Sequence, residues 1–286
     1  MNDREIQIIG SPSAGPNTFH EGYEDFPIVK EAALEITLNV SACFDCHFCP
    51  QNKLAAAYKS DKRRLSMEDF ELILKKLPKG VSIHFSGFSE PFLNPLAPKM
   101  IALAKEQGFN VHLYSTLMGL TKSGAGQLPK TIDFCCVHAP DLKGLVLNED
   151  IWIEQHYHWR SLGIPYMVMA MGNTSKKVKD HMDLLNIKIN RRKMLSRGGN
   201  LWDVKKSMGH IVCFKNRWHK NVILPSGDVY GCCMDWSLSV HLGNLLVQPY
   251  SEIYESAEGW KKSFKNQNSI CAHCEWNSGP EEPTIS

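Results

Sequence analysis

The sequence predicts an α/β protein whose first two thirds form an open, partial (β/α)6 barrel and whose last third adds a small unit. Strand-like and helix-like runs alternate from residue 34 to residue 196, and this alternation is typical of a parallel sheet. Six such units fall short of the eight that close a barrel. After Gly198 and Gly199 the alternation stops, and a β-hairpin and one helix are expected.

The elements of the barrel are expected in a simple order. Ser66 and Asp69 suit a capping box at the start of the first helix, and Pro78 marks its end. The expected strands are Leu34–Val40, Val81–Ser86, Asn110–Ser115, Ile132–His138, Tyr166–Met171 and Arg192–Ser196. The expected helices are Ser66–Leu77, Pro95–Gln107, Glu149–Leu162 and Ser175–Leu185.

The C-terminal unit is predicted from a turn signal. The run Pro225-Ser226-Gly227 separates two strand-like runs, Asn221–Leu224 and Val229–Cys232, and a helix follows over Ser251–Phe264. The predicted divisions of the chain are therefore an N-terminal extension over 1–30, the barrel over 31–200, the C-terminal unit over 201–278 and a disordered tail over 279–286.

Composition excludes several classes of function. The 286 residues carry 32 basic and 30 acidic side chains, so no global field attracts nucleic acid, and we expect no nucleic-acid partner. Residues 1–25 are polar and contain Pro12 and Pro16, which is unlike a signal peptide. No later run approaches 18 apolar residues, so we expect no membrane span and a cytoplasmic protein.

The ten cysteines are grouped, and in a reducing cytosol grouped cysteines indicate metal rather than disulfides. Three thiolates can hold three irons of a cubane cluster and leave the fourth iron open to a small molecule. A zinc site that uses His47 as a ligand is the alternative. Cys135 and Cys136 stand apart and are expected to be buried core thiols. The first group is Cys43, Cys46 and Cys49, and the second lies between Cys213 and Cys274.

The run Thr37–Pro50 resembles the cysteine loop of the radical S-adenosylmethionine (SAM) superfamily, which follows the first strand of a partial barrel. The family usually reads C-x3-C-x2-C, whereas this chain reads C-x2-C-x2-C. The resemblance extends from about Glu35 to the end of the chain. It implies a [4Fe–4S] cluster held by Cys43, Cys46 and Cys49, with SAM on the open iron and Phe48 near its adenine.

Two further segments resemble the SAM-binding stretches of that family. Phe88-Ser89-Glu90-Pro91 resembles its Gly-Gly-Glu-Pro stretch, which implies that Ser89 and Glu90 bind the methionyl ammonium. Leu113-Tyr114-Ser115-Thr116 resembles its Thr-Asn-Gly stretch, so Ser115 is expected to reach the ribose or carboxylate of SAM. His138 ends the fourth strand, where substrate or ribose would lie, although a structural role is the alternative.

The spacing Cys213-x13-Gly227-x4-Cys232, followed by Cys271-x2-Cys274, resembles the SPASM/twitch auxiliary-cluster domains of radical SAM enzymes. It implies a second [4Fe–4S] cluster held by four thiolates, and a zinc ribbon is the alternative. Cys233 is disfavoured, because adjacent residues on a strand face opposite sides. The expected ligands are Cys213, Cys232, Cys271 and Cys274.

The segment Ser196-Arg197-Gly198-Gly199-Asn200 resembles a Ser-Arg-Ala-Gly-Asn stretch that is common before these auxiliary domains. The resemblance implies that Arg197 faces the cavity between the clusters and holds SAM or substrate. A salt-bridged linker residue is the alternative.

The resemblance as a whole implies an oxidoreductase that reductively cleaves SAM to a 5′-deoxyadenosyl radical and abstracts hydrogen from a substrate. Dehydrogenation of an alcohol on a small polyol or aminocyclitol is favoured, because no N-terminal peptide-recognition domain is evident. Peptide modification and a non-catalytic metal-binding module are the alternatives. An electron donor such as flavodoxin or ferredoxin is the expected partner.

Overall fold

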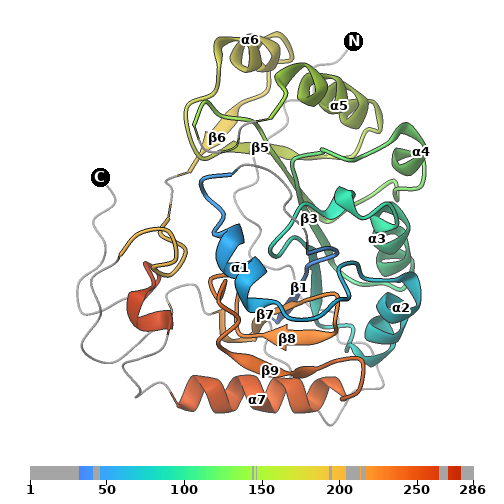
Figure 1. Ribbon diagram of the computed structural model, residues 1–286. Helices are drawn as coiled ribbons and strands as arrows, with labels where there is room; N and C mark the ends of the chain where they lie inside the picture. The colour runs from blue at the N-terminus through green and yellow to red at the C-terminus, as the bar shows by residue number, and fades with distance from the viewer. Residues whose placement is uncertain are drawn as a thin grey trace.

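The computed structural model describes residues 32–40, 46–143, 145, 147–192, 195–203, 213, 217–263 and 270–277. Its centre is one nine-stranded sheet with the order β6-β5-β4-β3-β2-β1-β7-β8-β9 (Figure 1). The strands are β1 (Ala33–Ile36), β2 (Ser82–Phe85), β3 (Val111–Ser115), β4 (Phe134–His138), β5 (Met167–Ala170), β6 (Ile189–Arg191), β7 (Lys220–Ile223), β8 (Asp228–Tyr230) and β9 (His241–Asn244).

The strands from β6 to β7 pair in parallel, whereas β8 and β9 are antiparallel additions. Within the described residues β6 and β9 are edge strands, so the sheet is open. The predicted fold class, an open and mostly parallel α/β sheet, is confirmed. The strand β7 pairs with β1, so the C-terminal hairpin belongs to the same sheet as the barrel strands. The predicted domain boundaries stay predictions.

Helices α2 to α6 lie along the outer side of the sheet in Figure 1, and α7 lies beside β9. The predicted helices are all present, and Ser66 caps α2 by accepting a hydrogen bond from the Asp69 N–H at 3.1 Å. The helices are α1 (Gln51–Ala57), α2 (Met67–Lys76), α3 (Ala97–Glu106), α4 (Lys122–Ala125), α5 (Glu149–Ser161), α6 (Lys176–Leu184) and α7 (Tyr250–Lys262). Three short 3-10 helices in the described part of the chain are η1 (Pro91–Leu93), η2 (Arg217–His219) and η3 (Ile270–His273).

Some elements differ from the sequence prediction. The sixth strand that the structure describes is β6, where Ile189 pairs with Val168 and packs against the core. It lies before the predicted Arg192–Ser196, of which residues 193 and 194 are outside the described residues. The second hairpin strand ends at Tyr230, so Cys232 lies after β8 and not on the strand. Helices α1 and α4 and strand β9 were not predicted, since each is short and buries few apolar residues.

The two faces of the sheet have different roles. One face carries Leu34, Ile36 and Phe85 into the core beneath the helices, where they meet α2 residues such as Phe70. Burial of each such side chain contributes roughly 1.5–3 kcal/mol. The alternate positions of the strands point to the opposite, inner face. That inner face carries the polar residues described next.

Candidate functional site

The inner face of the sheet is polar where a core would be apolar. On β2 and β3 every second residue is fully buried, whereas His84, His112 and Tyr114 between them keep part of their surface accessible. The rings of His84 and His112 stack with their centroids 4.3 Å apart. Burial lowers the pKa of both histidines, and their mutual repulsion lowers that of His84 further. Both rings are therefore neutral near pH 7.

The two central cysteines face different sides of β4. Cys135 belongs to the helix-side core, as expected for a buried core thiol. Cys136 is also buried, but it lies on the inner face beside Tyr114 of β3. Burial raises the pKa of Cys136 to about 12, so it remains a thiol at neutral pH.

Arg217 connects the inner face to the C-terminal turn. Its Nη1 donates hydrogen bonds to Glu35 Oε1 at 2.8 Å and to Cys233 Sγ at 3.1 Å. Burial raises the pKa of Cys233 to about 11, and the positive charge of Arg217 opposes that rise. Cys233 therefore contacts Arg217 and is not among the residues that line the pocket of Cys232. The choice of Cys232 over Cys233 as a cluster ligand stays a prediction.

The N-terminal cysteine segment lies after the C-terminal end of β1. The sulfur atoms of Cys46 and Cys49 are 2.9 Å apart, while the predicted ligand Cys43 lies outside the described residues. Cys46 forms a backbone bridge with Leu145, in the loop after β4. The hydrogen bond from Cys49 lowers the pKa of Cys46 and Arg197 lowers it further, whereas burial opposes them. A low thiol pKa favours the thiolate that binds metal.

Arg197, which lies near the end of the predicted barrel region in the sequence, contacts the segment that carries Cys46 and Cys49. Its Nε donates to the carbonyl of buried Phe48 at 3.0 Å. Its positive charge also helps to lower the pKa of His138. The residues that follow Arg197 form hydrogen bonds with the C-terminal third of the chain. Asn200 Nδ2 donates to Met234 O at 2.9 Å, and Gly198 N–H donates to Glu275 Oε2 at 3.3 Å.

The Glu90 carboxylate is fully occupied by protein donors. Oε1 accepts from Ser115 Oγ at 2.6 Å and from Phe92 N–H at 3.1 Å, and Oε2 accepts from the N–H and hydroxyl of Thr116 at 2.6 and 2.7 Å. Burial raises the pKa of Glu90, and these four hydrogen bonds oppose the rise. Glu90 and Ser115 thus bind each other and fix the turn after β3. Their predicted contacts with SAM stay predictions.

Two predicted site residues carry buried polar atoms that have no hydrogen-bond partner among the described residues: Ser89 Oγ and His138 Nε2. Burial, with Arg197 and Arg192, lowers the pKa of His138 to about 4, so the ring is neutral at pH 7. Buried polar atoms without partners are rare in folded proteins and indicate a missing ligand or water. Both residues therefore fit a polar cofactor or substrate at the C-terminal ends of β2 and β4.

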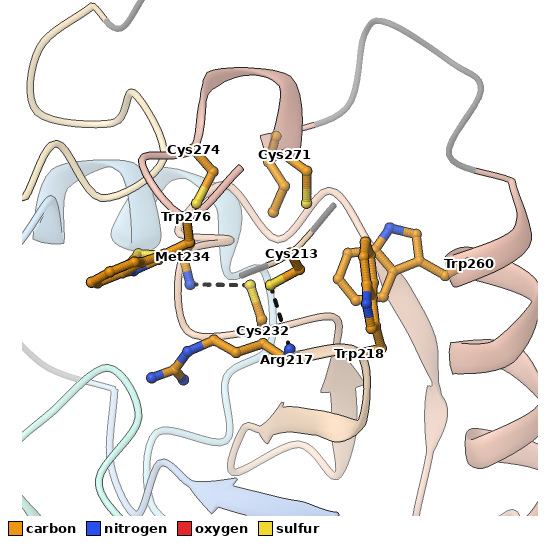
Figure 2. Close-up of a pocket in the computed structure, with 10 residues that line it drawn as sticks. Cys213, Arg217, Trp218, Cys232, Met234, Trp260, Cys271, Cys274 and Trp276 are labelled. Carbon is orange, nitrogen blue, oxygen red and sulfur yellow. Dashed lines mark hydrogen bonds between the residues drawn. The ribbon is translucent and has the colours of Figure 1, made fainter. Parts of the chain in front are cut away.

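Four cysteines from separate parts of the C-terminal third line one pocket (Figure 2). Trp218 and Trp260 stand on one side of these thiols, and Met234 and Trp276 stand on the other. Burial raises the pKa values of Cys232, Cys271 and Cys274, that of Cys274 to about 12, so a bound metal would be needed to favour the thiolate form of these three side chains at neutral pH. The four are Cys213, Cys232, Cys271 and Cys274, the set that the spacing predicted.

Backbone groups already point at this thiol pocket. The Arg217 N–H lies 3.4 Å from Cys213 Sγ, and the Met234 N–H lies 3.5 Å from Cys232 Sγ. Such hydrogen bonds to sulfur tune the potential of iron–sulfur clusters. In the described part of the chain the sulfur atoms are not gathered into a preassembled metal-ligand group. The donor set nevertheless fits a four-thiolate cluster in its chemistry.

Sequence reasoning missed the polar residues of the inner face. Glu35 lies between Leu34 and Ile36, and a carboxylate inside an apolar strand is a signal that was available. His84 and His112 give the same signal on the next two strands. Arg217 lies outside any pattern and could be found only from the structure.

The C-terminal part of the chain matches a known protein family. Residues 213–275 match the model of the SPASM iron–sulfur cluster-binding domain. A search of curated protein sequences finds no match. No helix among the described residues is long and apolar enough to cross a membrane.

Solved structures share the fold. A crystal structure of BtrN in complex with AdoMet and 2-DOIA is 17% identical, with 89% of this chain and 97% of that chain covered and a TM-score of 0.58. The Streptococcus suis SuiB structure bound to precursor peptide SuiA is 15% identical, covers 85% and 69%, and has a TM-score of 0.61. Native anSMEcpe with bound AdoMet is 13% identical, covers 89% and 91%, and has a TM-score of 0.58.

The predicted resemblance is thus confirmed at two levels: the chain has the fold of these structures, and its residues 213–275 match an iron–sulfur cluster-binding domain of the SPASM type.

Proposed function

We propose that this chain is a radical SAM oxidoreductase with two [4Fe–4S] clusters. The first is held by Cys43, Cys46 and Cys49 and leaves one iron for SAM. The second is held by the four thiolates of the C-terminal pocket. The observation that supports the proposal is that contacts join both cysteine regions to one polar inner face. Arg197 contacts the carbonyl of Phe48, between Cys46 and Cys49, and Arg217 contacts both Cys213 and Glu35.

The topology supports a substrate between these two groups. Cys46 and Cys49 follow the C-terminal end of β1, where parallel α/β sheets place their ligands. Cys213 and Arg217 precede β7, which is parallel to β1, and Cys232 follows the antiparallel β8. The polar residues of the inner face lie on the strands between, so they are available to bind and orient a polar substrate. These are Glu35, His84, His112, Tyr114 and His138.

SAM, when bound, supplies a 5′-deoxyadenosyl radical after uptake of one electron, and the protein orients the substrate carbon and excludes water. We propose that the substrate is an alcohol of a small polyol or aminocyclitol. The balanced reaction converts SAM and a secondary alcohol to methionine, 5′-deoxyadenosine, the corresponding ketone and one proton. Cleavage of SAM would take up one electron, and a cluster held by the thiols of the C-terminal pocket would accept one electron from the substrate. Neutral His138 and the Glu35–Arg217 pair are the groups that support binding of hydroxyl or amino substituents.

A peptide substrate is the second candidate, because the SuiB structure of the same fold is bound to a peptide. A deuterium-labelled substrate separates the two candidates. Transfer of deuterium from the carbinol carbon of a polyol or aminocyclitol into 5′-deoxyadenosine supports the first, and transfer only from a labelled peptide supports the second.

The experiment that tests the enzyme proposal is SAM cleavage after anaerobic reconstitution. We expect about eight irons per chain, and a Cys43/Cys46/Cys49 triple alanine variant should keep about half of them. Dithionite and SAM should give 5′-deoxyadenosine with the wild-type protein and none with the triple variant. Zinc in place of iron at both sites, with no SAM binding, would support a non-catalytic metal-binding module instead.

A further inference from the structure

The segment that contains helix α1 is strongly basic. Residues 51–65, here called the basic segment, hold five basic residues and one acidic residue, Asp61, for a net charge of +4. Since the whole chain has a net charge of only +2, the remaining residues carry −2. The exposed cations of the basic segment are Lys53, Lys59, Arg63 and Arg64.

Ion pairs within the described residues do not neutralise these cations. Among the ion pairs of the described residues, only Lys62 of the basic segment has an acidic partner, Asp69. Arg63 lies over the ring of Tyr58, 5.2 Å from its centroid, which fixes its position without neutralising its charge. Lys53, Lys59 and Arg64 therefore present their full charge to solvent.

The basic segment packs against Cys49, one of the N-terminal thiols. Cys49 packs against the small cluster that contains Leu54 and Tyr58, on the inner side of α1. The Gln51 N–H also donates to the Cys49 carbonyl at 2.7 Å. Lys53 is exposed on the outer side of the same helix. Because a helix with its side chains is about 10–12 Å across, the exposed side of α1 at Lys53 lies about one helix diameter from Cys49.

A hollow in this surface gives a partner a place to enter. It lies between α1 and the segment that precedes α2, and two arginines are among its lining residues. Its lining combines three apolar side chains, three amides and two arginines, with no acidic residue among the described residues that form it. The lining residues are Asn39, Val40, Gln51, Asn52, Leu54, Ala55, Arg63 and Arg64.

We infer that the basic segment is the docking surface for an acidic one-electron carrier protein of the flavodoxin type, which reduces the N-terminal site. This inference rests on the proposed function, in which one electron enters for each SAM cleaved. Electron-transfer complexes use small interfaces, and complementary charge raises their association rate in a salt-dependent way. A nucleic acid fits less well, because the net charge of the chain outside the segment is negative.

The test compares two variants with equal change in net charge. The first, Lys53→Glu/Lys59→Glu/Arg64→Glu, reverses the basic segment and spares Arg63. The control, Lys130→Glu/Lys179→Glu/Lys188→Glu, reverses three exposed lysines elsewhere on the surface. SAM cleavage is driven either by flavodoxin with its reductase and NADPH, or by dithionite. Binding of oxidised flavodoxin is measured separately by calorimetric titration at low and high salt.

We expect the basic-segment variant to lose about tenfold in flavodoxin-driven rate and in flavodoxin affinity, with a shallower salt dependence. Its dithionite-driven rate should stay within about twofold of wild type, and the control should match wild type throughout.

Three outcomes overturn the inference: an unchanged flavodoxin affinity and rate, an equal loss in the control, or a parallel loss of the dithionite-driven rate. If the wild-type protein binds flavodoxin through the segment but yields no 5′-deoxyadenosine even with dithionite, the docking surface stands and the proposed function fails. The binding measurement therefore separates the two claims.

Discussion

Arg197 donates a hydrogen bond of 3.0 Å from Nε to the Phe48 carbonyl, and this contact joins residues that are 149 positions apart in the sequence. Its backbone has a φ of +57°, a region that disfavours residues with a Cβ atom. A side chain held on a strained backbone, against the segment that carries Cys46 and Cys49, has a positioning role that can be tested.

Replacing Arg197 with alanine should lower the dithionite-driven rate of SAM cleavage by about 10- to 100-fold, the value of a charge-assisted hydrogen bond of about 1.5–3 kcal/mol. Arg197→Gly should lose as much activity. It should nevertheless exceed the alanine variant in free energy of unfolding by about 1 kcal/mol, since glycine tolerates the positive φ. Wild-type activity in either variant would contradict the role assigned to the side chain.

The adjacent cysteines after β8 should behave differently when each is replaced by serine. Cys232→Ser removes a thiol from the C-terminal pocket, so about half of the iron should be lost after reconstitution. Cys233→Ser should keep the full iron content, because Cys233 accepts a hydrogen bond from Arg217 and faces Glu35. Iron analysis and the electron paramagnetic resonance spectrum of the reduced protein check both results. The reverse pattern would assign Cys233 as the ligand.

Two glycines with positive φ form a matched pair for a stability test. At Gly87, before the Ser89-Glu90 turn, a Cβ atom would lie 2.2 Å from Thr37 Oγ1. At Gly108 the φ is similar, +83° against +75°, but a Cβ atom would meet nothing within 4 Å. Gly108→Ala should therefore cost about 1 kcal/mol, and Gly87→Ala should cost at least about 2 kcal/mol more through overpacking. Equal losses in urea unfolding would show that the contact with Thr37 relaxes freely.

Acid should destabilise the protein through His156, which is fully buried between α5 and α6. Burial, with His181 and Arg160, lowers the pKa of His156 to about 4. Between pH 4 and pH 6.5 the unfolded chain therefore binds more protons at this group than the folded chain. The free energy of unfolding should fall as the pH drops through that window and should not depend on this group above it.

His156→Gln is the control for that pH dependence, because it removes the titration. Its loss of stability between pH 7 and pH 4.5 should be smaller than that of the wild type, by on the order of 2 kcal/mol. His138, whose pKa is also lowered to about 4, remains in both proteins and cancels in the comparison. Identical pH profiles would show that His156 is not held neutral by burial.

The parts of the fold that depend on local pattern were predictable. The Ser66 cap, the alternation of strands and helices and the hairpin turn at Gly227 each depend on residues close in sequence, and the structure contains all three. The boundary of β6 was not predictable, because the strand is short and its place depends on pairing with β5. The pairing of β7 with β1 joins segments about 190 residues apart, and local pattern carries no information about it.

Some features of the candidate site were also predictable from local sequence, and others were not. The sequence by itself determined which cysteines are grouped, and it identified the thiols of the C-terminal pocket, because metal-ligand spacing is a local property of the chain. Only the tertiary structure decided that Glu35 and Arg217 meet across 182 residues, that Ser115 binds the carboxylate of Glu90, and that Arg197 contacts Phe48. Those contacts depend on which strands become neighbours and which face each side chain takes, and the packing of the whole sheet fixes both.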